Sequence, residues 1–124
     1  MPVTLSALLR QPSLGLTALT GREAPDREIY WVHASELLDP TPYLDGGELL
    51  LSVGMWLSPG TAVRKPGQAS VGAYVDRLVR PEVAALGFGV GLTHAAVPGA
   101  LIEAASAREL PLLSVPQTTP FIAI

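Results

Sequence analysis

The chain has 124 residues, of which 48% are hydrophobic and 15% charged; this is enough apolar material for one packed domain and excludes a disordered segment. Its formal net charge is −3 and its eight basic residues are scattered, so we expect no direct nucleic-acid binding by this domain alone. The chain has no cysteine, no apolar run near the roughly 18–20 residues of a membrane span and no signal-peptide pattern, so we expect a cytoplasmic protein without membrane association.

The first third of the chain predicts one short helix and two strands. Thr4 can cap a helix that Pro12 ends. Apolar residues alternate from Ser13 to Thr20, and residues 28–34 are rich in Ile, Tyr, Trp and Val; both patterns favour strands. Residues 35–43 carry two prolines and are expected to be irregular, with at most one short helical turn.

The remainder of the chain predicts buried strands that alternate with helices. An apolar run without alternation is typical of a strand buried on both faces, and apolar residues three and four apart are typical of a helix. We expect, in order, a strand at 49–53, a loop at 58–67, a helix at about 68–80 ended by Pro81, a strand at 83–88, a glycine-rich loop at 87–91, a helix with Pro98 in its first turn, and a strand at 112–115.

This β-α-β-α-β order determines the expected fold class. Such an order requires parallel strands joined by crossover connections. We therefore predict a single α/β domain over residues 1–124, with a mainly parallel or mixed β-sheet and flanking helices. The two earlier strands are expected to extend the sheet or to pack beside it.

Three glycines, Gly87, Gly89 and Gly91, alternate between a predicted strand and a predicted helix, and Thr93 and His94 follow them. This is a position at which α/β proteins often bind anions and nucleotides. The spacing differs from the dinucleotide-binding fingerprint, and there is no Walker lysine. Two interpretations are open: the glycines only allow a tight turn of the backbone, or they contact a ligand.

The two histidines, His33 and His94, and the nearby acidic residues Glu36 and Asp39 match no zinc-binding spacing. We expect no metal site, and nothing implies a cofactor. His33, Ser35, Glu36 and Asp39 do supply the imidazole, hydroxyl and carboxylates of nucleophilic catalysis. Serine and aspartate beside prolines are also what turns use to satisfy backbone groups, so we expect no catalytic residues and no enzyme.

Seven segments, in a fixed order, carry a resemblance that covers nearly the whole chain. They are Trp31–Glu36, Gly46–Gly54, Tyr74–Val75, Ala85–Gly89, Pro111–Leu113, Val115–Pro116 and Thr119–Ile122. Together they resemble the N-terminal domain of the PucR-type purine catabolism regulators, which are bacterial transcription factors. The resemblance implies a regulatory or sensory domain that binds a purine-related small molecule and signals to a fused or partner DNA-binding module. The alternative is a non-catalytic oligomerisation or protein-interaction module with no metabolite ligand.

Three places depart from the pattern of that family. Ser52–Val53 stands where the family usually has threonines, Arg80–Glu82 where it usually has a glycine-containing turn, and the 58–67 loop is unusual. Because one hydroxyl is lost at Ser52–Val53, the identity of a ligand does not carry over. In the resembled family further segments ending in a helix-turn-helix follow this domain, so the chain is expected to be either part of a longer regulator or a free-standing version.

The predicted sheet indicates where a ligand would bind. In open parallel sheets the carboxyl ends of the strands leave a crevice. Nine residues are predicted to line it: His33, Ser35, Glu36, Gly54, Gly87, Gly89, Gly91, Thr93 and His94. The glycines would admit a planar heterocycle, and the polar residues would read its edge. We also expect a homodimer or higher homo-oligomer, because the resembled regulators act as oligomers and residues 121–124 are apolar.

Overall fold

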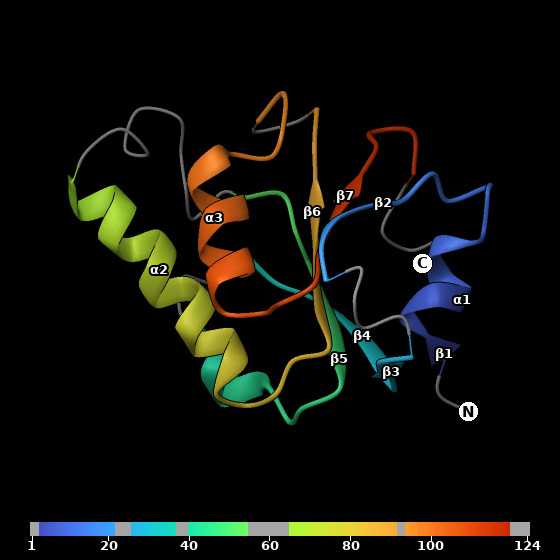
Figure 1. The fold of residues 1–124 in the computed structure, drawn as a ribbon, viewed down its shortest axis with the longest axis horizontal. Helices are drawn as coiled ribbons and strands as arrows, with labels where there is room; N and C mark the ends of the chain where they lie inside the picture. Colours follow the sequence, from blue (N-terminus) through green and yellow to red (C-terminus); the bar gives the residue numbers. More distant parts are fainter. Residues whose placement is uncertain (1–2, 22–25, 37–39, 55–64, 92–93, 120–124) are drawn as a thin grey trace.

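The structure, a computed structural model, describes residues 3–21, 26–36, 40–54, 65–91 and 94–119 (Figure 1). Its elements are β1 (Val3–Thr4), α1 (Leu5–Leu9), β2 (Thr17–Thr20), β3 (Glu28–Ile29), β4 (Trp31–Ala34), the 3₁₀ turn η1 (Thr41–Tyr43), β5 (Glu48–Ser52), α2 (Lys65–Val79), β6 (Ala85–Gly89), α3 (Gly99–Ala107) and β7 (Leu112–Val115).

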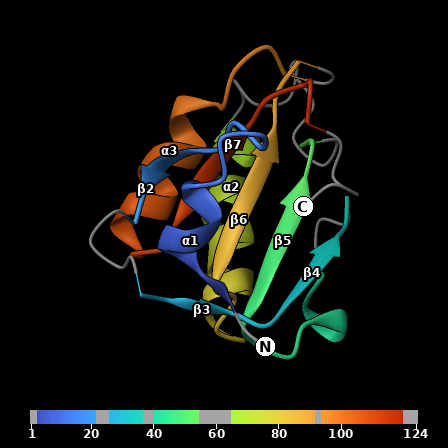
Figure 2. The same ribbon diagram turned by 90° about the vertical axis from the view of Figure 1, so that its right-hand side faces the viewer.

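A five-stranded mixed sheet with the order β2-β7-β6-β5-β4 forms the centre of the fold (Figure 2). Strands β4, β5, β6 and β7 are parallel, and β2 is antiparallel to β7. Every residue of β5 and β6 is buried, as expected of central parallel strands. β1 and β3 form a separate two-stranded antiparallel ribbon. The predicted single α/β domain with a mixed sheet and flanking helices is confirmed.

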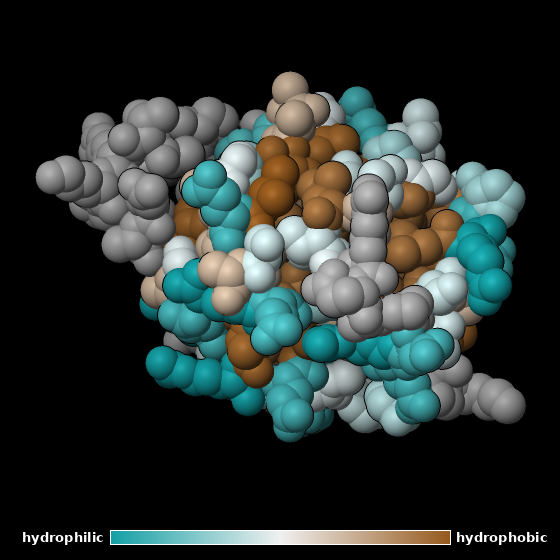
Figure 3. All heavy atoms as spheres, in the orientation of Figure 1, coloured by the Kyte–Doolittle hydropathy of each residue, from teal (hydrophilic) through white to brown (hydrophobic). Residues whose placement is uncertain are grey.

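The two faces of the sheet are covered by different elements (Figures 1 and 2). Helices α2 and α3 pack on one face, and α1 lies on the other. The consecutive leucines of β5 alternate between the two cores, with Leu50 in the core under α2 and α3 and Leu49 and Leu51 in the core under α1. In the orientation of Figure 1, with α2 and α3 on the left and α1 on the right, hydrophilic atoms gather along the lower edge of the molecule, and hydrophobic atoms are exposed higher up (Figure 3).

Strand β2 closes one edge of the sheet and joins the start of the chain to its end. It pairs with β7, and the register of this pair shifts between Ala18 and Thr20. The Thr20 hydroxyl spans the irregularity: it donates to Leu110 O at 2.5 Å and accepts from Leu112 N–H at 2.9 Å. One side chain thus replaces regular ladder bonds at this point.

Helices α2 and α3 end in the same way, at the amino end of the parallel strands. Glu82, after α2, and Glu109, after α3, have positive φ angles of 61° and 57°. In each case the glutamate N–H donates to the carbonyl three residues earlier, and the next N–H donates to the carbonyl five residues earlier. This is the Schellman pattern, in which glycine is the usual residue. The left-handed conformation costs a non-glycine residue roughly 1–2 kcal/mol.

A buried carboxylate holds the connection into β5. The side chain of Glu48 is only 2% exposed. It accepts hydrogen bonds from Asp45 N–H at 2.5 Å and from Gly46 N–H at 2.8 Å. Hydrogen bonds to an ionised acceptor are about twice as strong as neutral ones. This side chain therefore orders the turn that begins the central strand.

Two of the predicted strands have different boundaries in the structure. The strand predicted from Ser13 begins only at Thr17, because Leu14 N–H donates to Gln11 O at 3.1 Å and the chain turns there. The strand predicted over 28–34 is two strands, since β3 pairs with β1 while β4 pairs with β5.

The remaining boundaries concern the second half of the chain. Strand β6 extends to Gly89, so the glycine-rich loop predicted from residue 87 begins later than expected. Helix α2 begins at Lys65 rather than near 68, with Pro66 in the first turn, where proline is well tolerated. Of the predicted 58–67 loop, residues 58–64 lie outside the described residues. The single helical turn expected within 35–43 is η1.

Candidate functional site

Glu36 joins β4 to β5 at the carboxyl end of the sheet. Its Oε1 accepts from Ser52 Oγ at 2.9 Å, and its Oε2 accepts from Val53 N–H at 2.7 Å. Ser52 ends β5 and is fully buried, and its Oγ also accepts from Gly54 N–H at 3.1 Å. These bonds fix the orientation of the carboxylate and hold the backbone that follows β5.

Gly54 packs directly against two aromatic rings. Its φ is +78°, and a Cβ here would lie 2.4 Å from Phe88 Cζ and 2.9 Å from His94 Cδ2, so only glycine fits. His94 Nε2 lies 3.1 Å from Gly54 O. Because a carbonyl only accepts, we assign the hydrogen to Nε2, which leaves Nδ1 as the acceptor of the neutral ring. The Phe88 and His94 ring centroids are 5.5 Å apart.

Two further predicted residues lie on β4 or directly after it. His33 is half-buried in β4, in register with Leu50. Ser35 N–H donates to Leu51 O at 3.0 Å, which continues the pairing with β5 beyond the last residue of β4. Because of this pairing, the next residue, Glu36, lies beside the end of β5. Asp39 lies outside the described residues.

The glycine-rich segment is divided between the sheet and the turn after it. Gly87 and Gly89 belong to β6; Gly87 lies within the predicted strand at 83–88, and the prediction that Gly89 lies in a loop was wrong. A Cβ on Gly87 would lie 2.6 Å from Leu51 Cδ2, in the core under α1. Gly91 N–H donates to a backbone oxygen, that of His94, at 2.7 Å and closes the turn. Thr93 lies outside the described residues.

Hydrogen bonds connect some of the predicted residues through partners that sequence reasoning did not include in the site. The connected predicted residues are Glu36, Gly54 and His94. The hydrogen-bond partner it missed is Ser52, and it also missed Phe88, whose ring packs against His94; both are strand residues. For Ser52 a signal existed, since it is the polar residue at the end of the apolar run of β5. For Phe88 no signal existed, because its contact with Gly54 depends on the packing of the folded chain.

Tyr74 of α2 is fully buried. Burial raises the pKa of its hydroxyl well above the ordinary value, and the negative charge of Glu36 raises this pKa further. The phenol therefore stays protonated throughout the physiological range.

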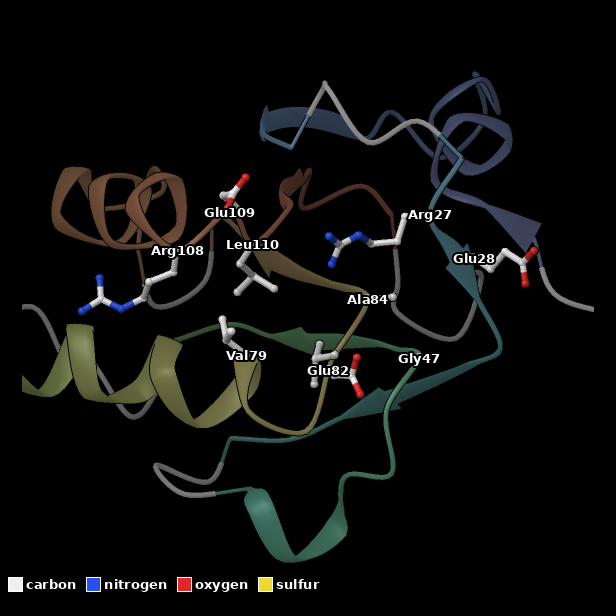
Figure 4. A pocket seen from close by; sticks show the side chains of 10 residues that line it. Arg27, Glu28, Gly47, Val79, Glu82, Ala84, Arg108, Glu109 and Leu110 are labelled. Atoms are coloured by element: carbon white, nitrogen blue, oxygen red, sulfur yellow. The ribbon is translucent and has the colours of Figure 1, made fainter.

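An open hollow of about 440 Å³ lies at the opposite, amino end of the parallel strands (Figure 4). Its lining includes Arg27, Glu28, Gly47, Val79, Glu82, Ala84, Arg108, Glu109 and Leu110. Figure 4 shows the Arg27 side chain reaching into the space between the strands and the ends of the helices. The Arg108 Nε donates to Asp76 Oδ1 at 2.7 Å and so links α3 to α2. None of the predicted site residues that the structure describes lines this hollow.

Two common kinds of functional feature are absent from the part of the chain that the structure describes. No described helix has both the length and the apolar character to cross a membrane. Within the same part of the chain, no three His, Cys, Asp or Glu side chains are grouped so that they could hold a metal ion.

The fold is that of a domain found in a regulatory region of known structure. It is similar to part of the structure of the CBS and DRTGG domains of the regulatory region of Clostridium perfringens pyrophosphatase, which is complexed with the activator diadenosine tetraphosphate. The TM-score is 0.55 at 16% sequence identity, over 90% of this chain and 40% of that chain. At this identity the likeness defines the fold alone.

Sequence comparison defines the family. Residues 7–124 match the Purine catabolism regulatory protein-like family, PucR. The chain is also 31% identical over 122 residues to the transcriptional activator PmfR of Paenarthrobacter nicotinovorans, a match over 98% of this chain and 24% of the activator. This chain therefore belongs to the purine catabolism regulatory protein-like family, as the resemblance predicted. It spans about a quarter of the length of that relative.

Proposed function

We propose that this domain is the sensor of a cytoplasmic regulator of purine catabolism. It binds a purine-related small molecule at the carboxyl end of the sheet and signals to a DNA-binding module in the same protein or in a partner. The observation that carries this proposal is the hydrogen-bonded group formed by Glu36, Ser52, Gly54 and His94. The group lies where open α/β sheets bind their ligands. Membership of a transcription-regulator family supports the regulatory part.

The chemistry of the group matches the edge of a purine ring. Purines and their oxidised derivatives present ring N–H donors beside ring or exocyclic acceptors. The Glu36 carboxylate is a charged acceptor whose orientation is fixed by Ser52 and Val53. In the tautomer with its hydrogen on Nε2, the His94 ring offers a second acceptor at Nδ1. Because both groups are already ordered, a ligand loses less free energy to ordering the site.

The related fold adds a reason to expect a small molecule. The pyrophosphatase regulatory region is complexed with diadenosine tetraphosphate, whose adenine rings are purines. That ligand belongs to that protein. For this chain it shows only that a protein with a related fold is regulated by a small molecule.

A thermal-unfolding screen of the domain against xanthine, guanine, urate and allantoin tests the proposal. A true ligand at about 100 times its Kd is expected to stabilise the domain by about 2.7 kcal/mol. Glu36→Gln and His94→Ala are expected to lose this response, whereas Glu82→Gln, at the opposite end of the sheet, keeps it. Each variant is first compared with the wild type without ligand, so that a folding defect is separated from a binding defect.

Two further outcomes decide between the alternatives. In the proposed function the domain is non-catalytic, so chromatography recovers the bound molecule unchanged; a converted product would make the domain an enzyme. If no compound of the panel stabilises the domain, the proposal that it binds a purine-related metabolite is wrong. The domain would then be an oligomerisation or interaction module, a second candidate that the exposed aromatic residues Tyr30 and Trp31 favour.

A further inference from the structure

Exposed hydrophobic side chains gather at the edge of the sheet formed by β4. Tyr30 is 54% exposed, Trp31 53% and Val32 44%. The rings of Tyr30 and Trp31 are in contact, with centroids 6.3 Å apart. Val3, also exposed, is close by on β1, where it pairs with Ile29. Large apolar side chains grouped in this way commonly mark a surface that another molecule covers.

The backbone of β4 is available for pairing on its outer side. Among the described residues, β4 is the last strand of the sheet and pairs only with β5. Ser35 N–H donates to Leu51 O, and backbone groups alternate sides along a strand, so the N–H and C=O groups of Val32 and Ala34 point away from β5. Charged side chains and prolines usually keep an edge strand from pairing with another strand. Residues 31–35 contain no Asp, Glu, Lys, Arg or Pro.

The opposite edge of the sheet differs in this respect. Strand β2 has an irregular register with β7, which bends an edge and disfavours a further strand. Strand β4 keeps a regular register with β5 over its four residues. Of the two edges, β4 is the one suited to continue the sheet.

We propose that β4 pairs antiparallel with β4 of a second copy of this chain, around a two-fold axis at His33. In this register the N–H and C=O groups of Val32 form hydrogen bonds with the C=O and N–H groups of Ala34 in the second copy. By symmetry, Ala34 of the first copy pairs with Val32 of the second in the same way. His33 then faces its own counterpart, and Trp31 faces Ser35. The two five-stranded sheets become one continuous sheet.

A second copy fits this edge because the surface is complementary to itself. An uncharged strand meets its counterpart without like-charge repulsion, and a two-fold axis places the same apolar patch on both sides. An aromatic side chain can bury about 150–250 Å² of surface area. The exposed halves of Tyr30 and Trp31 alone therefore offer on the order of 200 Å² of surface per copy for burial in the interface. A weak specific interface needs roughly 500–600 Å² per partner, and the paired backbone, Val3 and Val32 add to the aromatic share.

The pairing also connects assembly to the proposed ligand site, a step that rests on the proposed function. Trp31 of one copy lies opposite Ser35 of the other, next to Glu36. The second copy therefore contributes a wall to each carboxyl-end site. A ligand that contacts both copies must favour the dimer, and by linkage the dimer must favour the ligand.

A single cysteine tests the register. The chain has no cysteine, so His33→Cys introduces one reporter. Directly opposed residues of a non-hydrogen-bonded antiparallel pair have Cα atoms about 4.5 Å apart, within disulfide range. Mild oxidation of H33C is expected to convert most of the domain into a covalent dimer. Thr17→Cys, exposed on the opposite edge strand, and Trp31→Cys, off the axis, are the controls. Cross-linking of H33C at no more than the rate of T17C overturns the proposal.

Solution mass provides the second test, independent of the cysteine. Light scattering at tens of micromolar is expected to give twice the 13.0 kDa monomer mass for the wild type and for Thr17→Lys. Val32→Lys places a charge in the paired edge and is expected to raise the dimer Kd by at least about tenfold. A monomeric wild type, or a dimer unaffected by V32K, overturns the proposal. Glu36→Gln is expected to lose the ligand response while it remains a dimer. This result tests the ligand site separately from the dimer interface, which V32K tests.

Discussion

The two ends of the parallel sheet are built on different plans. At the carboxyl end, side chains bond to one another and to the backbone, so Glu36, Ser52 and His94 have fixed positions. At the amino end an open hollow is lined by charged side chains, and both α2 and α3 end there. Glu82 and Glu109 add negative charge where the helix dipoles are already negative, and Arg27 and Arg108 add positive charge to the same lining. The difference teaches that ordered polar groups, rather than the open hollow, define the candidate site.

The largest expected effect is at the carboxyl end, in Gly54→Ala. The left-handed backbone costs roughly 1–2 kcal/mol and the clash with Phe88 and His94 about 1–3 kcal/mol more. Urea denaturation is therefore expected to show a loss of about 2–5 kcal/mol. Gly99→Ala is the matched control, because nothing lies within 4 Å of a Cβ there. Equal stability of the two variants would contradict the close packing of Gly54.

At the amino end, Glu48→Ala is expected to cost about 2–4 kcal/mol of unfolding free energy. The change removes a buried charged acceptor and leaves the amides of Asp45 and Gly46 without it. Glu48→Gln, which keeps one acceptor oxygen, should cost less. The exposed Glu103→Ala on α3 is the control and should stay near the wild type. A loss no larger than that of E103A would mean that the amino end has no rigid anchor.

Alkaline unfolding tests the buried Tyr74. Its folded-state pKa is raised, so the folded domain keeps a proton that the unfolded chain releases above about pH 10. Stability is therefore present below that pH and falls as the pH rises above it, by up to about 1.4 kcal/mol per pH unit. Tyr74→Phe should remove this part of the decline, whereas the exposed Tyr43→Phe should not. Parallel pH profiles for wild type and Y74F would refute the assignment.

The smallest effects are expected from Glu82→Gly and Glu109→Gly, each a gain of about 0.5–1 kcal/mol. Glycine relieves the left-handed strain, and its greater entropy in the unfolded chain offsets part of the gain. Glu103→Gly, inside α3, should instead cost about 1 kcal/mol. If the first two changes destabilise the domain, the glutamates make compensating contacts and the amino end is less open than its hollow suggests.

The sequence predicted those features that depend on local patterns. The unbroken apolar run of β5 indicated a buried parallel strand, and the spacing of Val71, Val75 and Leu78 indicated α2. The sequence suggested a turn at Gly87, but in the structure this glycine allows the Leu51 side chain to approach the backbone of β6 closely. That approach is visible only once β5 and β6 are aligned.

The candidate site was predictable only in part for the same reason. Glu36 and Ser52 are 16 residues apart, and their contact depends on the register of β4 against β5. The position of Glu36 could be placed at the end of a strand from the sequence. Its partner could not, because several registers satisfy the same apolar pattern.

The pairing of β2 with β7 has a consequence for the synthesis of this domain. The Thr20 hydroxyl bonds across 92 residues to Leu112, and the Thr119 hydroxyl bonds across 105 residues to Leu14 O. An edge closed by such distant segments forms only after almost the whole domain has left the ribosome. Until then β2 has no sheet edge to join, and the apolar strands β5 and β6 emerge without their final cover. The nascent chain therefore passes through a stage in which its most apolar segments depend on late folding or on chaperones.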